Sequence, residues 1–298
     1  MFEEATLYSP VKAADDGTVE VQLSADHPGF ADPEYRRRRN EIAGLALDWS
    51  PGQPIPHASY TEAEQEIWRT ISRELRPKWE QYAVKEFLEA VDALALPTDR
   101  VPQLDEATAA LQRETGWSFA PAAGLVPLRE FYESLADKTF HSTQYLRHHS
   151  VPLYTPEPDV VHEVIGHGNT LAHPRWAAIY EEAGRAAKRV QTEEALEFVS
   201  HVFWFTIEFG VLYEGSDLKC YGAGLLSSFG EIEEFRSADI RPLDIRAMGV
   251  QDYDITHYQP ILFAAESFDH LEDVVGGFFR DATDDLCAKL AAGERATA

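Results

Sequence analysis

Residues 159–167 read DVVHEVIGH, and this stretch is the sharpest local signal in the sequence. It superficially suggests the His-Glu-x-x-His helix of zinc peptidases, but the spacing excludes that motif. Zincin histidines are four residues apart, whereas His162 and His167 are five apart, about 140° around an ideal α-helix. They can share one metal ion only if the helix ends or distorts between them, which Gly166 makes possible.

Glu208 is a third candidate ligand, inside the apolar run WFTIEF at 204–209. An unpaired ionised carboxylate there would cost several kcal/mol or neutralise itself. No Lys or Arg falls between Gln191 and Lys219, so no local cation is available. A lone histidine is usually a core residue, and a distant Arg is the alternative partner for the glutamate, but the three together favour a metal. Two imidazoles and one carboxylate suit non-haem iron and catalytic zinc equally, so both stay open here.

The composition is that of a soluble globular chain with a strong acidic excess. The 298 residues include 51 Asp or Glu against 26 Lys or Arg, a net charge of −25. The negative electrostatic field of such a chain repels phosphate backbones and anionic lipids, so neither nucleic acid nor a membrane is expected as a partner. The basic run at 36–39 stands among Asp32, Glu34 and Glu41, which predicts a solvated or ion-paired face.

Cysteine usage and the N-terminus indicate a cytoplasmic protein. Cys220 and Cys287 are too few for a disulfide framework and lack metal or redox spacing. The N-terminal residues carry no secretory signal, and no window reaches the ~18 to 20 apolar residues of a membrane span.

Helical periodicity dominates after Pro33. Helices are predicted over 60–75, where Thr61 and Glu64 form a capping box, and over 82–94, 105–115, 128–135 and 193–213. Prolines exclude regular helix from 145–159, and strand-like runs are few and short. We predict a mainly α fold with a few short β-strands: one compact domain over 23–290, with an N-terminal arm at 1–22 and a flexible tail at 291–298.

Longer motifs in register resemble the catalytic domain of the pterin-dependent aromatic amino acid hydroxylases. They cover roughly residues 24 to 270 and read SADHPGFADPEYRRRR, GQPIP, VPQLDEATAALQRETGW, FHSTQYLRH, TPEPDVVHEVIGH, FWFTIEFG, YGAGLLSSFGE and HYQPILFAAESF. The resemblance implies Fe(II) held by His162, His167 and Glu208, a tetrahydropterin such as tetrahydrobiopterin, and O2 as co-substrate.

The resemblance also implies roles for residues around the metal. Glu163 would act in catalysis by positioning pterin and oxygen. The pterin would stack on Phe131 and meet the backbone from Gly124 through Val126 to Leu128. Substrate contacts are implied for six residues: Arg147 for the amino acid carboxylate, Thr155, Pro156, Trp204 and Phe209 for the pocket, and Ser227 behind a ligand histidine. After His167 the chain departs from the family, reading GNTLAHP where better-known members carry a more apolar VPLF-like run.

The predicted activity is hydroxylation of L-phenylalanine to L-tyrosine. Relatives selective for tryptophan tend to carry Phe in place of Trp204, and those selective for tyrosine tend to carry Asp in place of Ala264. Hydroxylation at the 3-position, or of tyrosine or tryptophan, stays open. Remoter alternatives are a zinc hydrolase and a non-catalytic binding protein. With no regulatory domain of the family before the core and no heptad helix after it, a monomer is predicted.

Overall fold

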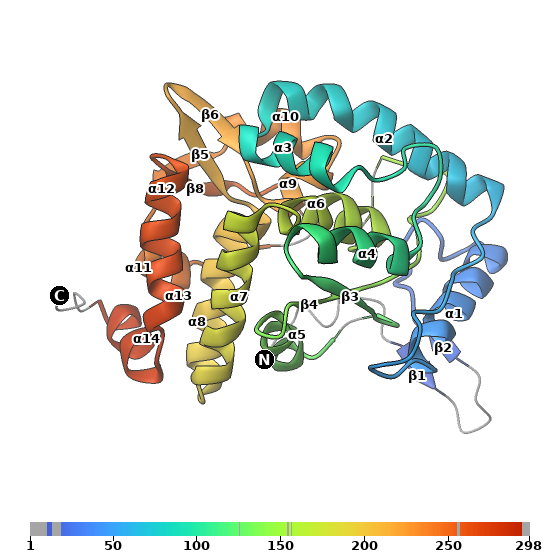
Figure 1. Cartoon of the computed structure of the whole chain (residues 1–298), viewed down its shortest axis with the longest axis horizontal. Helices are drawn as coiled ribbons and strands as arrows, with labels where there is room; N and C mark the ends of the chain where they lie inside the picture. The colour runs from blue at the N-terminus through green and yellow to red at the C-terminus, as the bar shows by residue number, and fades with distance from the viewer. Residues whose placement is uncertain are drawn as a thin grey trace.

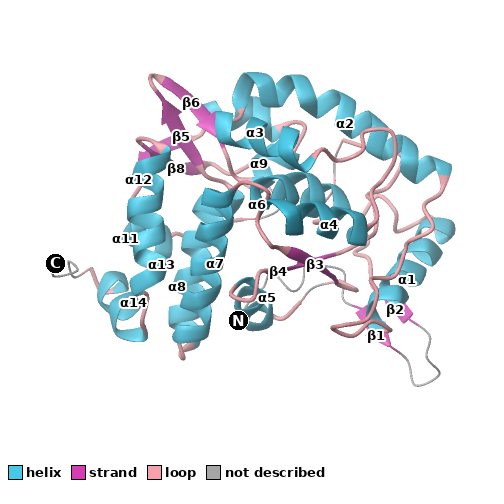
Figure 2. Ribbon diagram, in the orientation of Figure 1, coloured by secondary structure: helices cyan, strands magenta, loops and turns pink. Residues whose placement is uncertain are grey.

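The mainly helical fold predicted from the sequence is confirmed (Figure 1; Figure 2). The computed structural model describes residues 11–13, 19–124, 126–153, 155, 157–254 and 257–293. The longer helices are α1 Pro33–Leu47, α2 Glu62–Tyr82, α3 Lys85–Leu94, α4 Leu104–Glu114, α5 Leu128–Leu135, α7 Pro174–Arg189, α8 Glu193–Phe203 and α14 Asp284–Ala291.

Shorter helical segments connect these helices and include three π-helices, η2, η3 and η5. The segments are η2 Val161–Gly168, α6 Asn169–Leu171, η3 Trp204–Glu208, α9 Ala223–Ser227, α10 Glu231–Glu234, η4 Phe235–Ser237, α11 Ile245–Gly249, α12 Phe268–Leu271, η5 Glu272–Gly276 and α13 Gly277–Asp281.

The strands form three small sheets. They are β1 Val11–Ala13, β2 Val19–Val21, β3 Ser118–Pro121, β4 Thr139–Ser142, β5 Val211–Glu214, β6 Asp217–Cys220, β7 Asp239–Pro242 and β8 Ile261–Ala265. β1 pairs with β2 antiparallel, β3 with β4 parallel, and the remaining four form a sheet of order β6-β5-β8-β7 in which only β5 and β6 are antiparallel.

Most of the core is one large cluster of buried apolar side chains, which includes residues of η2 and η3, the segments that carry the candidate ligands. Helices α7, α8 and α13 run side by side. Helix α2 runs along the upper edge of the view, near α9 and α10 (Figure 1). The largest fully buried rings include Trp68, Trp117, Trp176 and Tyr180. A smaller cluster joins β2 to α1, so the part of the predicted arm that the structure describes is paired strand packed on a helix.

The capping box at Thr61 and Glu64 is present, and α2 continues beyond the predicted end to Tyr82. The predicted helix over 193–213 is wrong at its end: helix stops at Glu208, and Val211–Glu214 is strand β5. An apolar run of that kind is compatible with a buried strand as well as with a buried helix. The run forms a strand because it pairs with β6 on one edge and with β8 on the other.

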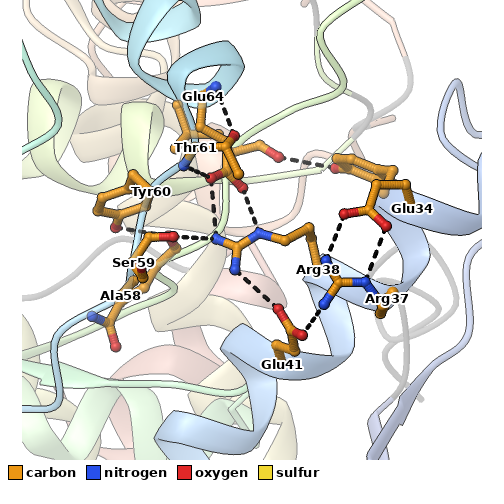
Figure 3. Close-up of polar contacts among 12 residues, drawn as sticks. Glu34, Arg37, Arg38, Glu41, Ala58, Ser59, Tyr60, Thr61 and Glu64 are labelled. Carbon is orange, nitrogen blue, oxygen red and sulfur yellow. Dashed lines mark hydrogen bonds and ion pairs between the residues drawn. The ribbon is translucent and has the colours of Figure 1, made fainter.

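The basic run on α1 divides into two groups. Arg37 and Arg38 form the predicted ion-paired face, with Glu34, Glu41 and Glu64 as partners (Figure 3). Arg39 departs from the prediction, because its side chain is 3% exposed and points into the protein.

Among the described residues, no helix is long and apolar enough to cross a membrane.

Candidate metal centre

His162 and His167 lie on the same face of η2 because this segment is a π-helix. In a π-helix the hydrogen bonds join residues five apart, so side chains at that spacing point the same way. The two Nε2 atoms are 3.0 Å apart. The distortion that the sequence required near Gly166 is therefore confirmed, as a π-helix over Val161–Gly168 rather than a single break.

Glu208 ends η3, a second π-helix, and completes the group. Its Oε1 lies 3.1 Å from Nε2 of His167, and its Oε2 lies 3.5 Å from Nε2 of His162. In the part of the chain that the structure describes, no Lys or Arg nitrogen lies within 4.0 Å of this carboxylate. The buried glutamate therefore faces two imidazoles, and the metal ion expected from the absence of nearby basic residues stays a prediction.

Hydrogen bonds on the far side of each ring determine which nitrogen carries the proton. Ser227 Oγ donates to the carbonyl oxygen of Ala223, so it accepts from Nδ1 of His162 at 2.9 Å. Thr170 Oγ1 donates to the His167 carbonyl and accepts from the Tyr180 hydroxyl, which in turn accepts from Nδ1 of His167 at 2.8 Å. Both imidazoles are then neutral with an unprotonated Nε2.

This arrangement fits a bound cation. Two nitrogen lone pairs 3.0 Å apart repel each other unless a cation lies between them. Atoms that are each about 2.1 Å from one ion lie about 3.0 Å apart at a right angle and about 3.4 Å apart at a tetrahedral angle. The three separations of 3.0, 3.1 and 3.5 Å span both values, so the distances fit an ion without choosing iron or zinc.

Glycines let α9 pack against both ligand-bearing helices. A Cβ on Gly166 would lie 2.9 Å from the carbonyl oxygen of Ala223, and one on Gly222 would lie 2.3 Å from the carbonyl oxygen of Glu208. Real Cβ atoms do not approach that closely, so these positions require glycine. The same packing places Ser227, the last residue of α9, against His162.

Burial controls the titration of the groups around the candidate ligands. It lowers the pKa of His162 to about 4, and the neighbouring His167 adds to the effect. Burial also raises the pKa of Glu163, to which the charges of Glu208 and Asp159 contribute. Burial acts in the same direction on Glu208, and only contact with a protonated His167 or His162 would lower the pKa of Glu208 overall. With both imidazoles neutral, a bound cation would take that role. A divalent ion would favour the ionised form of both glutamates.

A cavity of about 140 Å³ opens onto the three candidate ligands. Most residues to which the resemblance assigns a role line it: His162, Glu163, His167, Glu208, Gly124, Val126, Leu128, Phe131 and Trp204. Phe131 and Phe140 pack edge to face at 5.4 Å between ring centroids, and Trp204 stacks on Tyr253 at 4.1 Å. Glu163 has a carboxylate oxygen within 4.8 Å of both histidines, farther than the oxygens of Glu208.

Four implied substrate residues lie away from the cavity wall. Arg147 forms a bidentate pair with Asp159, Nε to Oδ2 at 2.9 Å and Nη2 to Oδ1 at 2.8 Å. Thr155 bonds to the backbone of Glu157. Phe209 packs behind Trp204 at 4.6 Å, and Ser227 lies behind His162. Pro156 is outside the described residues. Their substrate roles stay predictions.

Several residues of the cavity and its support were not predicted from the sequence. Arg39, Tyr132, Phe140, His141 and Tyr253 line the wall. The sequence pattern does indicate that Arg39 is buried, because Arg39 shares one helical face with the buried residues Ile42, Ala43 and Ala46. Its guanidinium lies 3.2 Å from the Tyr145 ring centroid, and Nη1 lies 2.5 Å from Glu157. Nothing in the sequence pattern marks Tyr180 or Thr170 as partners of His167.

Comparison with known proteins agrees with this centre. Residues 14–286 match the family described as biopterin-dependent aromatic amino acid hydroxylase. The chain is 49% identical over 271 residues to phenylalanine 3-hydroxylase of Streptomyces coeruleorubidus, covering 91% of this chain and 97% of that protein. It is 41% identical over 264 residues to bovine phenylalanine-4-hydroxylase, covering 87% of this chain but only 58% of the bovine enzyme.

A solved structure adds the cofactors of a relative. Chromobacterium violaceum phenylalanine hydroxylase with bound iron(III) and 7,8-dihydrobiopterin superposes with a TM-score of 0.71 at 28% identity, covering 79% of this chain and 85% of that chain. The fold and the centre are those of a pterin-dependent metal hydroxylase. The chain belongs to the biopterin-dependent aromatic amino acid hydroxylases. This confirms the predicted pterin dependence, and the iron-containing relative favours iron over zinc.

Proposed function

We propose that the chain hydroxylates the aromatic ring of L-phenylalanine, with Fe(II) bound by His162, His167 and Glu208. The observation that carries the proposal is the convergence of two unprotonated Nε2 atoms and one buried carboxylate at the wall of a cavity. When bound, iron and tetrahydropterin supply the activation of O2. The chain's own residues hold the metal, orient both organic molecules and exclude water.

The cavity wall supports a pterin site at Phe131. This ring and the residues Gly124, Val126 and Leu128 all line the cavity, where a flat heterocycle could stack on the ring and bond to backbone. Glu163 lines the same cavity and has a carboxylate oxygen within 4.8 Å of both histidines, which supports a role in orienting pterin and oxygen.

Trp204 and Ala264 support an unsubstituted aromatic substrate. Trp204 lines the cavity and is held by stacking on Tyr253 and by a hydrogen bond from its Nε1 to Oε1 of Gln259 at 3.2 Å. Ala264 is buried, is not one of the described residues that line the cavity, and carries no polar side-chain group that could pair with a ring hydroxyl. Thr155, Pro156 and Phe209 stay proposed substrate contacts, with Arg147 for the carboxylate.

For the ring position we propose C4, which gives tyrosine and matches the activity named for bovine phenylalanine-4-hydroxylase. A second candidate is C3, because the streptomycete relative is named phenylalanine 3-hydroxylase and is the more similar of the two curated relatives, at 49% identity. The two outcomes differ only in where the ring is held relative to iron.

Product analysis tests the proposal directly. The protein is loaded with Fe(II) without oxygen, given tetrahydrobiopterin and one of the three aromatic amino acids, and then exposed to O2. We expect 4-hydroxylated phenylalanine, while the 3-hydroxy isomer would select the second candidate. Pterin-independent peptide cleavage by a zinc-loaded protein would establish a hydrolase instead. Amino acid binding without turnover would establish a binding protein.

Further assignments of oligomeric state, location and partners accompany the activity. We infer a monomer acting in the cytoplasm on a small-molecule substrate, without nucleic acid or membrane partners. The strongly negative net charge of −25 supports the last point, because it opposes binding to anionic surfaces. A sedimentation measurement giving a tight tetramer would contradict the monomer.

A further inference from the structure

The indole of Trp204 forms part of the cavity wall, and two aromatic rings pack on it. Trp204 is the first residue of η3, the π-helix that ends at Glu208. Tyr253 lines the same cavity and stacks on the indole at 4.1 Å between ring centroids, with 9° between the planes. Phe209 packs on the indole at 4.6 Å with a tilt of 39°. These contacts hold the plane of the indole, but apolar contact is non-directional and constrains rotation within that plane only weakly.

A hydrogen bond at the edge of the indole supplies a directional constraint. Nε1 of Trp204 donates to Oε1 of Gln259 at 3.2 Å. Nε1 is the single hydrogen-bonding atom of a tryptophan side chain. An indole turned about its bond to Cβ would therefore lose Gln259 and change the shape of the cavity wall.

The side-chain amide of Gln259 has one orientation that suits its surroundings. Its Nε2 donates to the carbonyl oxygens of Asp254 at 2.9 Å and His257 at 3.1 Å. A flipped amide would turn its oxygen toward two carbonyl oxygens, neither of which can donate. Gln259 is 5% exposed, so water offers little compensation for a lost partner. Oε1 is therefore kept toward Trp204, and the same amide holds the segment that presents Tyr253.

The backbone around Gln259 is held independently of that amide. Its N–H donates to Oε1 of the buried Glu231 at 2.7 Å. The next carbonyl oxygen, that of Pro260, accepts from the N–H of Asp239 at 2.9 Å, and strand β8 begins at Ile261. A substitution of the Gln259 side chain should therefore leave the strand in place and release only the side-chain bonds.

We propose that Gln259 is a positioning residue for the aromatic substrate, which acts by holding the indole of Trp204 in one orientation at the cavity wall. That the positioned ring is phenylalanine rests on the proposed function. Among the described residues, the amide bonds to Trp204, Asp254 and His257 and to none of those proposed for the pterin. Loss of the amide should therefore weaken use of the amino acid and spare the pterin, whereas a loosened fold would affect both.

The test compares Gln259→Met, which keeps the length of the side chain and removes the amide, with the control Gln251→Met. Gln251 lies in the same segment, bonds to Arg241 and to the carbonyl oxygen of Asp252, and is not one of the described residues that line the cavity. In the presence of Fe(II), tetrahydrobiopterin and O2, Gln259→Met should raise the KM for L-phenylalanine about 3- to 10-fold, the equivalent of one lost hydrogen bond. Its KM for the pterin, and both KM values of Gln251→Met, should match wild type.

Two further variants show whether Gln259 acts through the indole. Trp204→Phe removes the N–H, so adding Gln259→Met to it should change the KM for L-phenylalanine less than about 2-fold. Gln259→Glu keeps an oxygen for the indole N–H and should stay within about 2-fold of the wild-type KM. It provides the same test should Gln259→Met fail to fold.

Near-ultraviolet circular dichroism of the metal-free protein tests the positioning without turnover. Trp204→Phe identifies the signal of the indole, which Gln259→Met should alter and Gln251→Met should not. An unaltered signal or an unchanged KM for L-phenylalanine in Gln259→Met would overturn the proposal. So would an equal rise in the KM for the pterin, an equal effect in the Trp204→Phe background, or a KM for Gln259→Glu as high as for Gln259→Met. Absence of hydroxylation by the wild type would instead contradict the proposed function, and the circular dichroism comparison would still decide whether Gln259 positions Trp204.

Discussion

The hydroxyl of Tyr180 lies 2.8 Å from Nδ1 of His167, and Thr170 Oγ1 lies 2.9 Å beyond it. Burial raises the pKa of Tyr180, and the charge of Glu208 adds to this, so the phenol stays protonated and can donate to Thr170. The chain of hydrogen bonds returns to the carbonyl oxygen of His167 itself. It therefore orients the ring and directs its unprotonated nitrogen toward the metal site.

Tyr180→Phe should weaken iron binding about 10- to 100-fold while leaving the fold intact, the usual effect of removing a partner of a ligand histidine. The measurement is an anaerobic Fe(II) titration followed by calorimetry. Tyr221→Phe is a matched control, because among the described residues its equally buried hydroxyl has no hydrogen-bond partner. Equal iron affinity in the two variants would refute the positioning role of Tyr180.

Glu208→Gln should abolish or greatly weaken iron binding, because it removes the only anionic group of the triad without changing its volume. Circular dichroism should show a retained fold. Glu163→Gln separates ligation from catalysis: its carboxylate lies farther from the histidines, so iron affinity should stay within a few-fold while turnover falls. If both variants bound iron like wild type, the assignment of Glu208 as a ligand would be wrong.

The sequence predicted the metal site because its constraints were local. Five-residue spacing required a distorted helix, and an acidic residue in an apolar run without nearby Lys or Arg required a cation. The π-helix η2 meets the first requirement. For the second, Glu208 faces the two histidines, and the cation itself stays a prediction.

What the sequence did not predict depends on contacts between distant elements. Tyr180 reaches His167 only because the fold brings α7 back toward this histidine, and no pattern in the sequence of α7 predicts that Tyr180 makes a polar contact. The end of the helix at Glu208 is decided by pairing of β5 with β6 and β8. Arg147 was assigned to substrate from the resemblance, whereas its bidentate pair with Asp159 is a contact that only the fold reveals.

The stability of the protein should fall as the pH rises from about 4.5 to 7, through Glu231. Burial raises the pKa of this side chain from 4.5 to about 7, against the opposing hydrogen bond from the backbone N–H of Gln259. Between those values the unfolded chain has released the proton and the folded chain has not, so deprotonation favours unfolding. The full effect is as much as about 3 kcal/mol above pH 7.

Glu231→Gln should therefore be more stable than wild type at pH 8 and similar to it at pH 4.5, since an amide keeps the acceptor oxygen and cannot ionise. Urea unfolding at both pH values measures the difference. Glu234→Gln, at an exposed position of the same helix, controls for the loss of one negative charge. A stability difference that did not change with pH would contradict the role of Glu231.

Arg147→Ala should destabilise the protein as well as impair substrate binding. Asp159 is fully buried, and Arg147 supplies two hydrogen bonds to its carboxylate, so removing the guanidinium leaves a buried charge uncompensated at a cost of about 3–5 kcal/mol. Arg147→Ala combined with Asp159→Asn removes that charge and should recover much of the stability. If Arg147 also binds the substrate carboxylate, the double variant should keep a raised KM for phenylalanine despite its recovered fold. A KM that returned to the wild-type value together with stability would show that Arg147 acts only through Asp159.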